Sequence, residues 1–291
     1  MSAGAPDAAG TVAQAWQAAV RLGLERIDAQ ALLAHVLALP AERARAWLLA
    51  HDTDPLPPEV HARYAGLVRR RAAGEPLAYL VGEREFFGLR LAVTPAVLVP
   101  RPDTETLVEW AIELLRDLPA PRVVDLGTGS GAIALSIKHA VPQADVSAVD
   151  LSPQALSVAR DNGERLGLAV HWLQGSWFEP LDTQAPFDLI VSNPPYIAQD
   201  DPHLAALQHE PSLALSSGPG GLDALRHIAG SARAHLPPGG WLLLEHGYDQ
   251  GAAVQALLHA AGFEAVTTRC DLAGQPRCTG GRVTQPDDRI G

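Results

Sequence analysis

"VVDLGTGSGAIAL", residues 123–135, is the stretch that decides the fold. It begins as a buried strand, passes through Gly127, Gly129 and Gly131, and continues as a helix. Glycines at such a turn let the backbone approach a ligand, and the start of the following helix offers free N–H groups. Nineteen residues after Gly131, Asp150 ends the next predicted strand, where its carboxylate can accept hydrogen bonds from ribose hydroxyls. The stretch therefore predicts a ligand with a ribose at the edge of a parallel sheet.

After residue 101 the chain alternates between strand-like and helix-like segments, which is typical of a parallel α/β sheet. Strands are predicted at 122–127, 145–150, 169–174, 187–193 and 240–246, and helices at 103–116, 131–140, 152–167, 222–236 and 250–261. Ser152 is placed to cap its helix, with Pro153 at the first helical position. Two strand-like pieces at 263–268 and 277–284 are expected to close the sheet as a hairpin. The predicted fold is a Rossmann-like, mainly parallel sheet.

The N-terminal part carries a different pattern. Apolar residues recur at helical spacing, as in Val12, Trp16 and Val20, with breaks at glycines and prolines, which indicates short helices. Further on, "REFFGLRLAV" (84–93) suggests a β-hairpin that turns near Gly88. The predicted organisation is a small helical domain over 1–73, a hairpin connector over 74–100 and the α/β domain over 101–291.

The composition excludes several classes of protein. Of the 291 residues, 22 are Lys or Arg and 33 are Asp or Glu, so the net charge is −11 and a broad phosphate-binding surface is not expected. No apolar stretch reaches membrane-spanning length, and the N-terminus lacks the basic and apolar segments of a secretion signal. Cys270 and Cys278 have neither zinc nor redox spacing. We therefore expect a cytoplasmic monomer with no metal, no membrane partner and no direct nucleic-acid substrate.

A second motif separates the possible ligands. The strand-like run "LIVSNPPYIA", residues 189–198, ends in Asn193, Pro194, Pro195 and Tyr196. Two adjacent prolines cannot donate to a sheet ladder, so the strand must stop there, at the carboxyl edge where ligands of open α/β sheets lie. The glycine loop alone also satisfies the dinucleotide fingerprint. An NAD-dependent oxidoreductase or a non-catalytic Rossmann binding module is therefore the alternative from another class.

Asn193–Tyr196 resembles the (Asp/Asn/Ser)-Pro-Pro-(Tyr/Phe/Trp) signature of class I S-adenosylmethionine-dependent methyltransferases that modify planar amino nitrogens. An amide nitrogen is a poor nucleophile because its lone pair is delocalised into the carbonyl. The Asn193 side-chain oxygen and the Pro194 carbonyl can accept the two N–H hydrogens, which orients the lone pair and favours the charge that develops on nitrogen. Tyr196 is expected to pack against the acceptor. No dedicated general base is required, since an alkylated amide cation loses its proton to water.

A wider resemblance specifies the acceptor. The segment 75–109, together with "DLGTGSGAIAL", "VSNPPYI" and "LLLEHG", is similar to the HemK/PrmC family of protein-(glutamine-N5) methyltransferases, which act on the Gly-Gly-Gln motif of peptide chain release factors. The resemblance runs from about Glu75 to Val283, with a helical domain of appropriate size ahead of it. It implies S-adenosylmethionine as cofactor and release factors as partners, and it implies that the helical domain recognises the substrate.

The resemblance also assigns site residues. The expected cofactor contacts are Gly127, Thr128, Gly129, Ser130, Gly131, Asp150, Trp177 and Asn193, and the expected substrate contacts are Asn193, Pro194, Pro195 and Tyr196, of which Asn193, Pro194 and Tyr196 are the expected catalytic residues. One position departs from the family pattern, because many members carry Asp where this chain has Ser176. An uncharged serine puts the adenine contact in doubt.

Several polar residues have two interpretations. Arg101 and Glu105 in "VPRPDTE" fit a capping and ion-pair cluster as well as a substrate-facing role. Glu245 and His246 end a strand on the ligand side. An isolated Glu-His pair at such a position more often has a structural role. His203, His209 and Glu210 do not have the spacing of a metal site.

Related activities remain as alternatives. A ribosomal-protein glutamine methyltransferase is the nearest, although "PRPDTE" favours the release-factor type. An adenine-N6 or cytosine-N4 methyltransferase would flip its base into the same loop, and the acidic charge argues against it.

Overall fold

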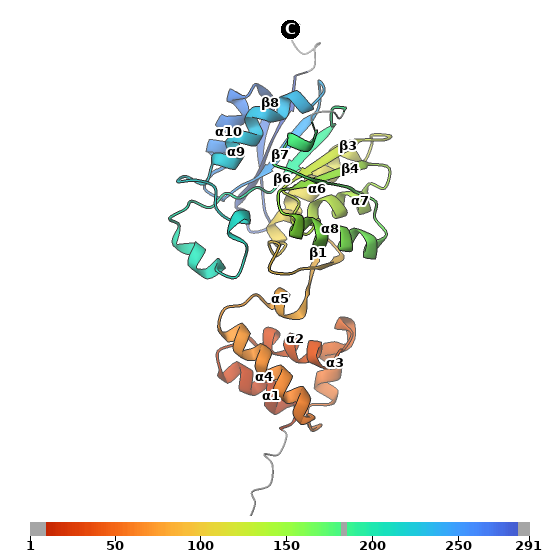
Figure 1. The fold of residues 1–291 in the computed structure, drawn as a ribbon, viewed down its shortest axis with the longest axis vertical. Coiled ribbons are helices and arrows are strands. Elements are labelled where there is room, and N and C mark those ends of the chain that lie inside the picture. Colours follow the sequence, from red (N-terminus) through yellow and green to blue (C-terminus); the bar gives the residue numbers. More distant parts are fainter. Residues whose placement is uncertain (1–9, 182–184, 285–291) are drawn as a thin grey trace, which may run out of the picture. The chain divides into compact units, whose positions relative to one another are not determined.

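A computed structural model of the chain describes residues 10–181 and 185–284 (Figure 1). The parts of the predicted domains at 1–9, 182–184 and 285–291 lie outside the described residues. The chain divides into two compact units, one that ends at Gly82 and one that begins at Glu83. No helix in the described ranges is both long and apolar enough to cross a membrane.

The first unit is helical, as the sequence predicts. Its helices are α1 (Val12–Arg21), α2 (Arg26–Val36), α3 (Ala41–Ala50), α4 (Pro58–Ala72) and α5 (Leu77–Val81). Leu32 and Leu33 of α2 are fully buried in their shared core, where the Tyr64 hydroxyl donates to the Ala29 carbonyl at 2.9 Å. The short helix α5 packs against α2 and α4 and thus extends the unit to Gly82. The helical pattern placed the end of this domain near residue 73.

The second unit opens with the predicted hairpin, β1 (Glu83–Phe86) and β2 (Leu89–Ala92), which pair antiparallel. Its main sheet consists of β3 (Arg122–Leu126), β4 (Asp145–Asp150), β5 (His171–Gln174), β6 (Leu189–Ser192), β7 (Trp241–Glu245), β8 (Phe263–Cys270) and β9 (Pro276–Val283). Among the described residues the order is β5-β4-β3-β6-β7-β9-β8. The first five strands are parallel, and β9 and β8 form the predicted antiparallel closure.

Helices cover both faces of this sheet. They are α6 (Glu105–Leu115), α7 (Ala132–Ala140), α8 (Pro153–Leu166), α9 (Asp223–Ser231) and α10 (Gly251–Ala260). Figure 1 shows α9 and α10 apart from α6, α7 and α8. Neighbouring strand residues alternate between two buried clusters, so Val123 packs in the cluster with α6 and α7, whereas Val124 packs in the cluster with α9 and α10. The central strands are apolar on both faces because both are covered.

Short 3₁₀ turns complete this unit: η1 (Pro102–Thr104), η2 (Glu179–Leu181), η3 (Pro202–Leu207), η4 (Ser212–Ala214) and η5 (Ala232–His235). The predicted cap of α8 is confirmed, since Ser152 Oγ accepts from the Ala155 N–H at 3.2 Å and Pro153 is the first helical residue. The helix after "VPRPD" starts at Glu105, and Thr104 occupies its N-cap position. Its hydroxyl makes no cap hydrogen bond and is therefore available to another partner.

Asn162 of α8 joins the hairpin to the glycine turn from a fully buried position. Its Nδ2 donates to the carbonyls of Ala92 at 3.0 Å and Ser130 at 2.9 Å, and its Oδ1 accepts from the Ala92 N–H at 2.7 Å. One side chain therefore satisfies three backbone groups that belong to β2 and to the turn between β3 and α7.

We predict that Asn162→Leu destabilises the protein by about 2–4 kcal/mol, because it leaves these three backbone groups unpaired. Urea denaturation measures the loss. Asp161→Ala is the matched control, since Asp161 is the exposed neighbour on the same helix, and its effect is expected to stay within about 0.5 kcal/mol. An Asn162→Leu protein as stable as the parent would contradict the anchoring role.

Candidate active site

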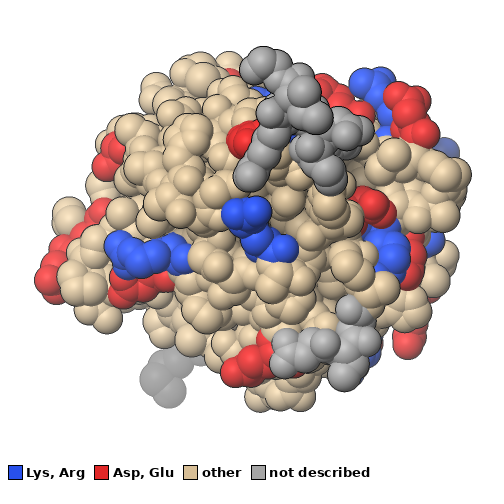
Figure 2. Space-filling model, turned by 90° about the horizontal axis from the view of Figure 1, so that it is seen from above, with Lys and Arg blue, Asp and Glu red and all other residues tan. Residues whose placement is uncertain are grey.

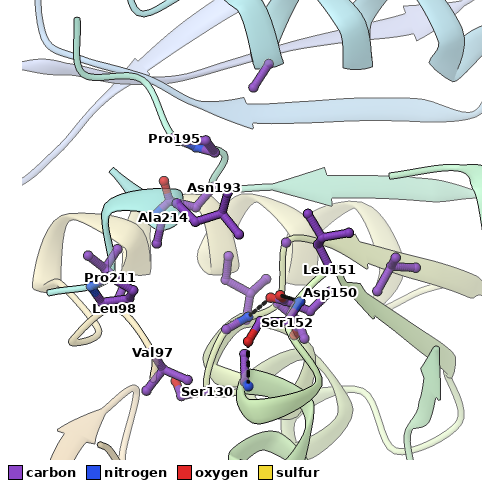
Figure 3. Close-up of a pocket in the computed structure, with 18 of the residues that line it drawn as sticks. Val97, Leu98, Ser130, Asp150, Leu151, Ser152, Asn193, Pro195, Pro211 and Ala214 are labelled. Atoms are coloured by element: carbon purple, nitrogen blue, oxygen red, sulfur yellow. Dashed lines mark hydrogen bonds between the residues drawn. The ribbon is translucent and has the colours of Figure 1, made fainter. Parts of the chain in front are cut away.

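A cavity of about 670 Å³ lies at the carboxyl edge of the parallel strands. The strand ends contribute the turn after β3, Asp150 after β4 and Asn193 after β6, and the segments around Leu98 and Ala214 supply the opposing wall. Figure 3 shows these side chains converging on one space, with Leu98 and Pro211 near one another. A volume of this size is typical of a site for one small organic ligand.

The turn between β3 and α7 (127–131) forms the floor of the cavity. Gly127, Gly129 and Gly131 have φ of 76°, 57° and 84°, a region that side-chain-bearing residues rarely adopt. A Cβ atom on Gly129 would meet no protein atom within 4 Å, so its place is left open to the cavity. The five residues that the sequence assigns here, from Gly127 to Gly131, are brought together as a cradle. Of these, Gly131 is the N-cap residue of α7 and is not among the residues that line the cavity.

Asp150 stands at the end of β4 beside this cradle. Its Oδ2 accepts from the Gly129 N–H at 2.8 Å and its Oδ1 accepts from the Ser152 N–H at 2.9 Å. Figure 3 draws the bond to Ser152. Burial raises the pKa of Asp150, and the backbone hydrogen bonds oppose that rise. Each carboxylate oxygen keeps a further lone pair for a ligand hydroxyl.

Trp177 covers the other side of Gly127. A Cβ atom placed on Gly127 would lie 3.5 Å from the Trp177 ring, an ordinary van der Waals contact, so the positive φ of 76° and not crowding by the indole favours glycine at this position. The backbone of Trp177 itself has φ of 48°, a strained conformation for a bulky residue. Ser176 lines the cavity next to it. The indole and the Ser176 side chain thus border the part of the cavity nearest the glycine turn.

The Asn-Pro-Pro-Tyr segment follows β6 directly. Asn193 and Pro195 line the cavity, whereas Pro194 and Tyr196 are not among its lining residues. Asn193 Nδ2 donates to Thr104 Oγ1 at 3.2 Å, and the Tyr196 hydroxyl donates to Glu245 Oε1 at 3.3 Å. The Tyr196 hydroxyl is thus bound to the carboxylate of the last residue of β7, and the packing of its ring against an acceptor stays a prediction.

Glu210 connects two segments that form a wall of the cavity, the segment before η1 and the loop after Tyr196. Only some residues of these segments are singled out by the sequence. The Glu210 carboxylate pairs with Arg101 and also accepts from the Val99 N–H at 3.2 Å, so the loop after Tyr196 is fastened to the segment before η1. The motif "VPRPDTE" was a signal for Arg101. The pocket residues Pro211, Leu213 and Ala214 carry no such motif, since they lie in irregular chain and short 3₁₀ turns.

The residues with two interpretations divide as follows. Glu105 Oε1 accepts from the Phe87 N–H at 3.1 Å, which is a structural role, whereas Arg101 lines the cavity. His246 is buried and its ring contacts Thr279 Oγ1 at 2.7 Å, and burial lowers its pKa. Within residues 10–181 and 185–284, no group of His, Cys, Asp and Glu side chains is placed to hold a metal.

Asp125 lies on β3 directly below the glycine turn, with no exposed surface. The Thr128 hydroxyl donates to its Oδ2 at 2.6 Å and the Ala134 N–H to the same atom at 3.3 Å. Burial raises the pKa of Asp125 to about 7, and these hydrogen bonds oppose the shift. The carboxyl therefore joins the glycine turn, at Thr128, to the first turn of α7, at Ala134.

Comparisons with known proteins agree with this geometry. Residues 106–210 match the methyltransferase small domain, and residues 16–82 match the PrmC N-terminal domain. Over 261 residues, 89% of the chain, the sequence is 55% identical to the release factor glutamine methyltransferase of Bordetella pertussis, of which 95% is covered. It is 52% identical over 262 residues to the Xylella fastidiosa (strain Temecula1) protein of the same name, with 89% and 94% covered.

The fold has counterparts among solved structures. A methyltransferase from Pyrococcus furiosus gives a TM-score of 0.52 at 18% identity, with 77% of this chain and 99% of that chain covered. A likeness at this identity concerns the fold alone, and it confirms the predicted fold class.

The Asp125 carboxyl makes stability depend on pH. Burial raises its pKa from the ordinary value of 3.8 to about 7 in the folded protein, so the free energy of unfolding that it contributes falls as pH rises from about 4 to 7. Asp125→Asn keeps an oxygen acceptor without the charge. We predict that the stability of this variant, measured relative to the parent, is higher at about pH 8 than at about pH 5. Urea denaturation at both pH values measures this change.

Asp161→Asn serves as the matched control, since its side chain is exposed. If the free energies of unfolding of Asp125→Asn and Asp161→Asn depend on pH in the same way, the charge of Asp125 does not destabilise the folded protein.

Proposed function

The chain belongs to the family of release factor glutamine methyltransferases, and we propose that it transfers a methyl group from S-adenosylmethionine to the side-chain amide nitrogen (N5) of the glutamine in the Gly-Gly-Gln motif of peptide chain release factors. The observation that carries the proposal is the position of Asn193. It lines the same cavity as the glycine turn and Asp150. An amide acceptor and a methyl donor can therefore meet within one enclosed space.

The residues of the cavity fit the proposed cofactor. The cradle at 127–131 leaves room that a side chain would fill, and Asp150 offers carboxylate lone pairs to ribose hydroxyls. Trp177 supplies an aromatic face beside Gly127. Ser176 provides a neutral hydroxyl in place of the carboxylate common in the family. When bound, S-adenosylmethionine supplies an electrophilic methyl group on a sulfonium centre.

The chain's own contribution is orientation of the acceptor amide. Asn193 Oδ1 accepts one amide hydrogen and the Pro194 carbonyl accepts the other, which turns the nitrogen lone pair toward the methyl donor. Both acceptors become stronger partners as positive charge develops on nitrogen. Pro195 keeps the loop stiff. The Tyr196 hydroxyl donates to Glu245 at the end of β7, which fixes the position of the loop.

We also propose that the helical unit recognises the release factor. The net charge of −11 argues for a protein substrate rather than a nucleic acid. Figure 2 shows acidic and basic side chains interspersed on a largely uncharged face, without a continuous basic patch on that face.

Mass spectrometry tests the function directly. A purified release factor incubated with the enzyme and S-adenosylmethionine is expected to gain one methyl group on the glutamine of Gly-Gly-Gln. Calorimetry is expected to detect binding of S-adenosylmethionine and none of NAD. An unmodified release factor with a folded enzyme and a bound cofactor would refute the proposed substrate.

For Asn193→Ala we predict a fall on the order of 100- to 1000-fold in single-turnover methyl transfer, because the acceptor loses a preorganised electrostatic contact. Cofactor affinity is expected to fall modestly at most, since Asp150 and the glycine turn are intact. Asn193→Asp is the matched variant, and its loss is expected to be smaller because the carboxylate keeps an acceptor. Transfer by Asn193→Ala at nearly the parental rate would exclude the proposed orientation.

The recognition role of the helical unit predicts the behaviour of a shortened protein that begins at Glu83. It is expected to bind S-adenosylmethionine as the parent does but to methylate intact release factor at least about tenfold more slowly, which corresponds to about 1.4 kcal/mol of lost recognition. Calorimetry supplies the control for folding, and the methylation rate at subsaturating release factor supplies the result. Full activity of the shortened protein would show that recognition lies elsewhere.

A further inference from the structure

A side chain outside the cavity binds the carbonyl group of Tyr196. Gln250, the N-cap residue of α10, donates from Nε2 to this carbonyl at 3.0 Å, and it is not among the residues that line the cavity. Gly221 leaves space for the contact, because a Cβ atom there would overlap the Tyr196 carbonyl oxygen and lie 3.0 Å from Gln250 Nε2. The contact therefore connects the end of the Asn-Pro-Pro-Tyr loop with the turn between β7 and α10.

The orientation of the Gln250 amide is fixed by the turn that follows β7. Its Oε1 accepts from the Gly247 N–H at 2.9 Å, and its own backbone N–H donates to the Gly247 carbonyl, also at 2.9 Å. An amide oxygen can only accept and an amide NH₂ group can only donate. The bond to Gly247 therefore directs the NH₂ group toward Tyr196.

A buried chain of hydrogen bonds fixes the same turn from the other side. The His246 Nδ1 lies 2.8 Å from the Gly247 carbonyl, which can only accept, so Nδ1 carries a hydrogen. Burial lowers the pKa of His246, so the ring is neutral and its Nε2 accepts from the Thr279 hydroxyl at 2.7 Å. Thr279 Oγ1 accepts from the Thr268 hydroxyl at 2.7 Å, and Thr268 Oγ1 accepts from Gln255 Nε2 at 2.8 Å. The donors of this chain all point toward the Gly247 carbonyl.

The peptide group between Tyr196 and Ile197 is bound at its other end as well. Its N–H, which belongs to Ile197, donates to the Leu215 carbonyl at 2.9 Å. Leu215 lies between Ala214 and Ser216, which both line the cavity. One peptide group thus joins the turn after β7, through its carbonyl, to a wall of the cavity, through its N–H.

We propose that Gln250 is a positioning residue for methyl transfer: by binding the Tyr196 carbonyl it fixes the end of the Asn-Pro-Pro-Tyr loop, and with it the Pro194 carbonyl that accepts from the acceptor amide. This inference rests on the proposed function, because the role of the Pro194 carbonyl belongs to that function. The rings of Pro194 and Pro195 fix φ at both positions. Few torsions between Tyr196 and Pro194 can therefore absorb a displacement of the Tyr196 peptide group.

A substitution that removes both side-chain bonds of Gln250 tests the proposal. Gln250→Met keeps the length of the side chain, and we expect single-turnover transfer at saturating cofactor and release factor to fall about 10- to 100-fold, since a small misplacement of reacting groups costs this much. The affinity for S-adenosylmethionine and the release factor concentration that gives half the maximal rate are expected to stay within about twofold. Urea denaturation checks that the variant is folded.

Gln143→Met is the matched control. Gln143 Nε2 also donates to a backbone carbonyl, that of Leu118, at 3.3 Å, and neither residue lines the cavity. Its rate of transfer is expected to equal that of the parent. An equal loss of rate in both variants would show that the effect does not come from the contact with Tyr196.

Gln250→Glu replaces the donor with a group that titrates. Its ionised carboxylate sets an acceptor against the Tyr196 carbonyl, whereas its protonated form can donate to that carbonyl as the glutamine does. We expect the rate of this variant, divided by the parental rate at the same pH, to rise about tenfold as pH falls from about 8 to 6. The division removes the titration of the ionisable groups nearby, which are Tyr196, Glu245, His246 and Asp249. A glutamine that only stabilised the fold would not produce this recovery.

A last measurement needs no release factor. The Ile197 amide belongs to the peptide group that Gln250 binds, and its hydrogen exchange, followed by nuclear magnetic resonance, is expected to be about tenfold faster in Gln250→Met and unchanged in Gln143→Met. Transfer by Gln250→Met at the parental rate, a rate ratio of Gln250→Glu that is independent of pH, or unchanged exchange of the Ile197 amide would overturn the proposal. A parent enzyme that methylates no release factor would instead refute the proposed function, and the exchange of the Ile197 amide would then decide whether Gln250 fixes the loop.

Discussion

Parallel pairing of the central strands is the constraint on which the site depends. β4 pairs with β3, β3 with β6 and β6 with β7, all in the same direction, so their carboxyl ends share one edge. Gly127, Asp150, Asn193 and Glu245 each lie at or just beyond such an end. Helical crossovers separate these residues along the chain, and the hydrogen-bonded register brings them within one region.

The same edge is also where the sheet interior is most polar. Asp125 and Glu245 are buried carboxyls whose desolvation raises their pKa values to about 7. Each accepts from one hydroxyl group, Asp125 from Thr128 and Glu245 from Tyr196. Neutralising either group would reduce the free-energy cost of burying it. The neutral group would, however, no longer be a charged acceptor that fixes the orientation of the hydroxyl that donates to it. The site thus gives up some folding stability to hold the glycine turn and the Asn-Pro-Pro-Tyr loop in fixed geometry.

The rest of the cavity is built from segments outside the sheet. The segment before η1 and the loop after Tyr196 form a wall, and Glu210 joins them through Arg101 and the Val99 N–H. The lining is largely apolar, with Leu98, Pro211 and Ala214 among its members. Such a wall excludes water and strengthens the few polar contacts that the strand ends provide.

The sequence by itself determined the strand–glycine–helix unit, Asp150 at a strand end, and the Asn193 loop, because hydrophobic periodicity and turn chemistry are local properties. Only the tertiary structure decided what Thr104, Tyr196 and Glu210 do. Thr104 occupies the N-cap position of α6, yet its hydroxyl makes no cap bond and accepts from Asn193 Nδ2 instead. These side chains take their partners from distant parts of the chain, and no periodic pattern records which polar groups will meet once the strands have paired.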